Sequence, residues 1–145
     1  MRFLMIPTPA PNSPTPPADA PFDEASFTAV MKYNEEMYKA GVLVASEGLN
    51  PAAKGAHVLV SGGTRRVLDG PFAETKELVA GFWLIEVQSR QEAIDWAMRC
   101  PITPGKDEVI EIRQLTGEDD LPRELVDLIT AAAPTWSAAF TRKRA

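Results

Sequence analysis

The apolar residues along the chain recur with two different periods. Alternation and short apolar runs predict strands, whereas recurrence every three to four residues predicts amphipathic helices. The predicted helices are residues 23–40, capped by Asp23 or Ser26, and residues 90–100, capped by Ser89. The predicted strands are residues 2–6, 42–47, 57–61, 65–68, 82–88 and 109–115.

The order of these elements is strand, helix, two to three strands, helix and strand. It favours an α+β fold of the ferredoxin-like kind, in which an antiparallel sheet carries two helices on one face. In strand 82–88 one face carries Trp83, Ile85 and Val87, but Phe82 and Leu84 make the other face apolar as well. Because an exposed apolar sheet favours association, we expect a homodimer with two sheets face to face, a dimeric α/β barrel. A binding cavity would lie between sheet and helices or at the dimer seam.

Two segments fall outside this pattern. Residues 7–21 hold seven of the 13 prolines, which predicts an extended loop, either a linker or a lid. A proline-rich ligand for an SH3-type module is the alternative. Residues 116–145 predict a C-terminal helical extension, in which Asp120 caps a helix with Pro122 in its first turn, followed by a basic tail. The predicted domain is therefore residues 1–115. We expect the extension to cover this domain or its dimer mate; the alternatives are a contact of its basic tail with a nucleic acid or an acidic partner, and a frayed terminus.

Composition narrows the classes of partner. The 145 residues carry a net charge of −5 and a pI of about 4.9, which argues against nucleic acid and anionic membranes as partners. The chain has no apolar run long enough for a membrane span, and its apolar N-terminal run is too short for a signal peptide, so we expect a cytoplasmic protein. The single cysteine, Cys100, excludes an internal disulfide and predicts a buried, inert thiol near a helix end.

The common catalytic and cofactor motifs are missing from the sequence. One histidine cannot form a zinc cluster, and neither a phosphate-binding loop nor a dinucleotide fingerprint is present. We therefore expect no metal and no cofactor.

The residues that remain for chemistry gather around a turn that starts at Asp69. This carboxylate either accepts backbone hydrogen bonds across its own turn or acts at a pocket rim as a general base or cation ligand. Glu47 follows an apolar strand and precedes a glycine, so it is a candidate partner, and His57 is either structural or a proton carrier. These three are the candidate catalytic residues. The candidate ligand-binding residues are Ser46, Phe72, Glu74 and Lys76, of which Glu74 and Lys76 are alternatively solvated surface.

The same segments resemble a known family. The runs Ser46–Leu49, Val67–Glu77 and Gly81–Val87, with the helix around Trp96 and the strand Val109–Arg113, are similar to the YCII-related proteins. The tetrapeptide Asp-Gly-Pro-Phe that begins at residue 69 resembles the DGPF branch, which is named after it.

This resemblance covers about residues 1–115 and implies a dimeric α/β barrel from a largely uncharacterised bacterial family. Asp69 matches the Asp of a His–Asp pair suggested as catalytic in some relatives, and the chain's only histidine is His57. Some members occur beside or fused to extracytoplasmic-function sigma factors, which implies a regulatory protein partner.

Three functions follow as hypotheses. In the first, the protein is an enzyme on a small organic molecule, with Asp69 as acid/base, Glu47 or His57 as its partner, and Lys76 as an anion contact. In the second, it is a ligand-sensing or regulatory dimer without catalysis, linked to a sigma-factor system. In the third, the Asp69 turn is purely structural and the chain is an assembly unit.

Overall fold

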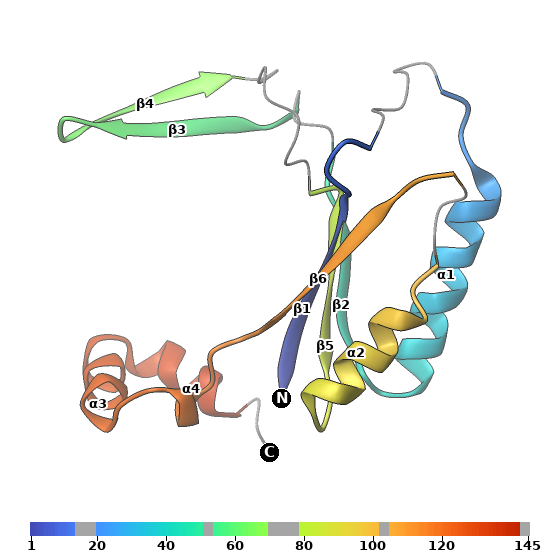
Figure 1. The fold of residues 1–145 in the computed structure, drawn as a ribbon. Helices are drawn as coiled ribbons and strands as arrows, with labels where there is room; N and C mark the ends of the chain where they lie inside the picture. Colours follow the sequence, from blue (N-terminus) through green and yellow to red (C-terminus); the bar gives the residue numbers. More distant parts are fainter. Residues whose placement is uncertain (14–19, 51–53, 70–78, 102–104, 143–145) are drawn as a thin grey trace. The chain divides into compact units, whose positions relative to one another are not determined.

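Four strands form the main sheet in the order β2-β5-β1-β6, and every neighbouring pair is antiparallel. The structure is a computed structural model, and it describes residues 1–13, 20–50, 54–69, 79–101 and 105–142. The elements of the sheet and its helices are β1 (Arg2–Pro9), α1 (Glu24–Lys39), β2 (Leu43–Gly48), β5 (Gly81–Glu86), α2 (Arg90–Met98) and β6 (Glu108–Gln114). The predicted antiparallel sheet with two helices is confirmed (Figure 1), whereas the pairing of two copies stays a prediction.

The core lies between one face of this sheet and the two helices. The register places Phe3 opposite Ile85 and Met5 opposite Trp83, so these four side chains share a face. Residues of both helices join them in one buried cluster, so α1 and α2 cover the same face (Figure 1). The cluster is Phe3, Met5, Tyr33, Met37, Val42, Trp83, Ile85, Val87, Ala93, Trp96 and Cys100. Each large apolar side chain buried here contributes about 1.5–3 kcal/mol.

The predicted helix caps are confirmed. The Asp23 carboxylate accepts a hydrogen bond from the Ser26 amide at 3.0 Å, and the Ser89 hydroxyl accepts one from the Glu92 amide at 3.1 Å. Both bonds satisfy amides that the first helical turn leaves without partners. No helix in the described part of the chain is long and apolar enough to cross a membrane.

Strand β1 extends into the proline-rich segment, which corrects the loop predicted from residue 7 onward. It pairs with β6 as far as Pro9, but its register with β5 ends at Met5. The Ala10 amide donates to the carbonyl of Asp107 at 2.9 Å, so even-numbered amides point toward β6. The ring nitrogens of Pro7 and Pro9 therefore point to the side that β5 no longer occupies, where no donor is needed.

Strands β3 (Ala56–Ser61) and β4 (Thr64–Asp69) form a separate two-stranded sheet, a hairpin whose turn is Gly62-Gly63. Both turn glycines have positive φ, 55° and 76°, as the predicted tight turn requires. Every residue of the two strands is exposed.

The second compact unit, Leu115–Ala145, begins after β6 and is described by itself. Its elements are a 3₁₀ turn, η2 (Glu118–Asp120), and the helices α3 (Arg123–Ala132) and α4 (Pro134–Arg142). Asp120 does not cap α3, contrary to the prediction, because its carboxylate accepts a hydrogen bond from the Gly117 amide at 2.6 Å. Leu121 precedes a proline and is extended, which separates the turn from the helix. Helix α4 was not predicted; it begins at Pro134, and proline is common at the first position of a helix.

Candidate functional site

A bulge in strand β2 decides which way the candidate residues face. Leu43 lies opposite Ile85, but Ala45 already lies opposite Leu84, so one extra residue is inserted between them. Simple alternation from Leu43 would place Glu47 among the buried residues. The bulge instead places Glu47 on the face of the sheet that α1 and α2 leave uncovered.

Ser46 consequently lies on the helix side, where a short chain of hydrogen bonds holds it. The indole Nε1 of Trp83 donates to Oδ1 of Asn34 at 2.6 Å, and Nδ2 of Asn34 donates to Oγ of Ser46 at 3.1 Å. Asn34 thus joins α1 to two neighbouring strands. Sequence reasoning missed it, although a single amide beside the buried positions 33 and 37 of the helix was a usable signal.

The face that carries Glu47 is apolar at its centre and charged at its rim. Leu4 and Leu84 lie opposite one another there and are half-buried, and Phe82 lies opposite Glu47. The other residues that the register assigns to this face are Arg2, Ile6, Thr8, Ala45, Glu86, Val109, Glu111 and Arg113. We call the whole set the open face of the sheet.

The hairpin carries the two other candidate catalytic residues, and it does not bring them together. Asp69 lies opposite Ala56, whereas His57 lies opposite Leu68. Because side chains alternate along a strand, Asp69 and His57 occupy opposite faces of the hairpin. Asp69 shares its face with the exposed Val58 and Val67.

The remaining candidates, Phe72, Glu74 and Lys76, lie outside the described residues, so no geometry is assigned to them. Among the described residues there is no group of three or more potential metal ligands.

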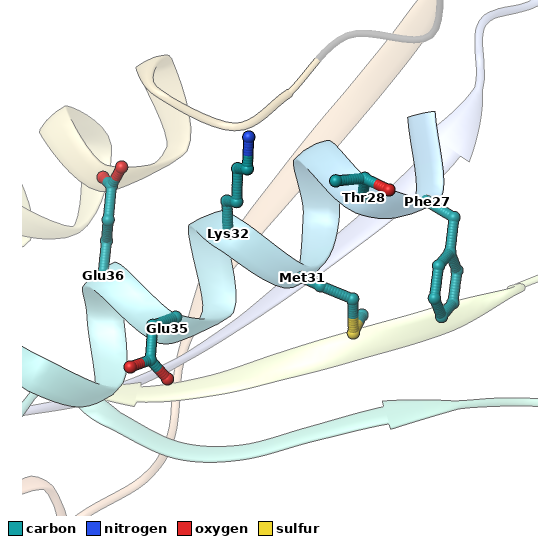
Figure 2. A pocket seen from close by; sticks show the side chains of 6 residues that line it. All are labelled: Phe27, Thr28, Met31, Lys32, Glu35 and Glu36. Atoms are coloured by element: carbon teal, nitrogen blue, oxygen red, sulfur yellow. The ribbon is translucent and has the colours of Figure 1, made fainter. Parts of the chain in front are cut away.

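A shallow hollow of about 470 Å³ runs along the outer surface of α1. Figure 2 shows Phe27 and Met31 directed to one side of the helix and Lys32 and Glu36 to the other. The described lining comes from one helix alone, so the side chains diverge and hold no common point where a substrate could react.

Four titratable groups among the described residues have clearly shifted pKa values, and two of them, Tyr33 and Cys100, belong to the core. Burial raises the pKa of Tyr33, whose hydroxyl donates to the carbonyl of Trp96 at 2.7 Å. Burial, and secondarily the charge of Glu108, raises the pKa of Cys100 to about 11. The thiol is therefore neutral at ordinary pH, as predicted for an inert cysteine.

Comparison with known proteins gives two findings. The sequence matches the family model described as the YCII-related domain over residues 1–117. An uncharacterized protein of Rhizobium meliloti (strain 1021) is 39% identical to the chain over 75 residues. That match covers 52% of the chain and 60% of the relative.

Proposed function

The chain belongs to the YCII-related domain family, and we propose that it is a homodimer that binds a small organic molecule at the seam between two copies. The tetrapeptide that begins at Asp69 further supports a place in the DGPF branch of that family.

One observation carries this proposal: two carboxylates lie on apolar surfaces that the described residues of the first unit, Met1–Gln114, leave uncovered. Glu47 borders Phe82 on the open face, and Asp69 shares the hairpin face with Val58 and Val67. The two valines are 62% and 64% exposed. Carboxylates beside apolar surface are the setting in which a covered site can orient a polar group of a ligand.

A second copy of the chain is the occupant that suits these surfaces best. A lone two-stranded hairpin is marginally stable in water, so β3 and β4 gain stability by packing against another surface. The open face carries both signs of charge at its rim, with Arg2 opposite Glu86 and Arg113 beside Glu111 at 3.4 Å. Such a face can meet its own copy with opposite charges paired, as a twofold interface requires.

The chemistry available at such a seam is proton transfer without a metal. Either carboxylate could take or give a proton once a ligand and a second copy exclude water from it. Lys76 would be an anion contact for that ligand. Binding without turnover is the second candidate, favoured by the exposure of Glu47 and Asp69 in the single chain, since acid/base groups are usually desolvated. A sigma-factor partner would fit this regulatory alternative.

The dimer is tested by sedimentation and light scattering on Val67→Glu. Because Val67 is 64% exposed in the single chain, the charge should leave each copy folded and abolish the dimer. Tyr38→Glu is the matched control, since Tyr38 is 71% exposed on α1 and should change nothing. A monomeric wild type, or a dimer untouched by Val67→Glu, would overturn the proposed seam.

The ligand is sought by thermal shift against a metabolite panel, because a molecule that binds only the folded state raises Tm. A stabilising compound should lose its effect in Glu47→Gln or Asp69→Asn and keep it in Asp127→Asn, an exposed carboxylate on α3. Turnover of that compound would identify an enzyme, and binding alone a sensor. A dimer that no compound stabilises, or stabilisation that survives both site variants, would contradict the binding site.

A further inference from the structure

A groove of about 480 Å³ lies between α2 and β6, on the helix side of the sheet. It is separate from the open face, so it does not depend on the function proposed above. Strand β6 supplies Glu108, Ile110 and Ile112, which alternation places on one side of the strand. The register confirms the direction, since Ile112 lies opposite the buried Met5.

Helix α2 forms the opposite wall. Ile94, Ala97 and Met98 recur at spacings of three and four, so they line one stripe of the helix, and Cys100 follows at its end. Met98 is 81% exposed, which leaves apolar surface open to solvent beside the groove. The walls are therefore mostly aliphatic, and the thiol adds no charge to them.

The charges at the mouth are not balanced. Lys106 lines the groove together with Asp107 and Glu108, so the charged side chains of the described lining sum to one negative charge. The ion pairs found in the described part of the chain do not include Glu108, whose charge instead acts on the buried Cys100 thiol. Asp107 adds a second negative charge to the lining. A negative group at the end of an aliphatic groove selects a cation with an apolar body.

We propose that this groove binds a small aliphatic amine, with its ammonium group at Glu108 and its hydrocarbon chain between Ile110, Ile112 and the α2 wall. The volume lies in the range of small-molecule pockets, roughly 300–1,000 Å³. A carboxylate of the same length would meet two negative side chains, Asp107 and Glu108, against one positive side chain, Lys106, so it should bind worse than the amine.

Cys100 makes the test direct, because it is the only cysteine and it lines the groove. Its reaction with the neutral disulfide 4,4′-dithiodipyridine is followed at pH 8 while hexylamine, hexan-1-ol or hexanoate is titrated. We expect hexylamine to slow the reaction at least fivefold with saturation. Hexan-1-ol should bind more weakly, and hexanoate should have no effect at the same concentrations.

Two variants on strand β6 test whether Glu108 is the residue that binds the ammonium group. Glu108→Gln should weaken the protection of Cys100 by hexylamine at least fivefold and leave the protection by hexan-1-ol unchanged. Because Glu108 also affects the thiol, protection is the ratio of the reaction rates without and with the compound, measured within each variant. Glu111→Gln is the matched control, since Glu111 lies opposite Ile6 on the other face of β6. Circular dichroism checks that both variants fold. Equal protection by hexanoate, equal losses in the two variants, or no protection by hexylamine would overturn the proposal.

Discussion

Replacing Gly81 by alanine tests the close approach that fixes the Glu47 end of the sheet. A Cβ at Gly81 would lie 2.6 Å from the carbonyl oxygen of Glu47 and 3.3 Å from the Cα of Gly48. Both neighbours are backbone atoms, so no side-chain rotation can relieve the overlap. Strand β2 must move away from β5, and Glu47 moves with it.

Two magnitudes decide the expected sign. Overpacking of this kind costs about 1–3 kcal/mol. Alanine in place of glycine gains about 0.4–1 kcal/mol where the backbone permits it, by restricting the unfolded chain. We therefore expect Gly81→Ala to lower the free energy of unfolding by about 1–2 kcal/mol. Gly48, which lies directly opposite in the register, has open space where a Cβ would be, so Gly48→Ala should be neutral or slightly stabilising.

Urea unfolding followed by far-UV circular dichroism separates the two variants. With a slope of about 2 kcal/mol per molar urea, the midpoint of Gly81→Ala should fall by about 0.5–1 M, and that of Gly48→Ala should not fall. Both are measured at one protein concentration, because association shifts apparent stability. Equal midpoints, or a Gly81→Ala midpoint at the wild-type value, would refute the argument from close approach.

Three further predictions concern the helix side of the sheet. Asn34→Ala leaves the indole N–H of Trp83 without its 2.6 Å acceptor, so the free energy of unfolding should fall by about 1–3 kcal/mol, whereas Asn50→Ala at an exposed position should be neutral. If the effects of Asn34→Ala and Trp83→Phe simply add in the double variant, the hydrogen bond does not have the role assigned to it. Because the pKa of Cys100 is raised to about 11 in the folded protein, the unfolded thiol loses its proton at lower pH than the folded one. The free energy of unfolding should therefore be level below about pH 8.5 and fall as pH rises toward 11. Cys100→Ser should reduce that fall in a pH series of urea titrations. Arg99 lies 4.3 Å from the Trp96 ring centroid and forms an ion pair with Glu36 at 2.6 Å. Arg99→Gln should therefore lower the free energy of unfolding by about 1 kcal/mol, and Glu36→Gln by less, as measured from urea midpoints. Equal losses in the two variants would mean that the contact with the ring contributes nothing.

The sheet and helices could be predicted because their patterns are local. Residues 82–87 form a short, almost wholly apolar run typical of a strand, and the burial of Trp83, Ile85 and Val87 follows from side chains that alternate between its two faces. Asp23 and Ser89 are short acceptors directly before helical runs, so their caps also follow from adjacent residues.

The direction of the candidate site residues could not be predicted, because it depends on a non-local feature. A single inserted residue in β2 reverses the faces of Ser46 and Glu47, and only the pairing with β5 shows it. The hairpin gives a second example. Alternation predicts that His57 and Leu59 share a face. It does not predict which residue of the other strand lies opposite each of them, and that register is what separates His57 from Asp69.

The two candidate carboxylates, Glu47 and Asp69, both lie beside apolar residues. Within the first unit, Met1–Gln114, helices α1 and α2 cover one face of the sheet, Leu4 and Leu84 on the other face are half-buried, and the hairpin valines are exposed. Contiguous exposed apolar residues of this kind often mark a surface that another molecule covers. Glu47 and Asp69 lie at the ends of those uncovered surfaces. Their exposure agrees with the proposed dimer seam, in which a second copy would complete the surroundings of both carboxylates.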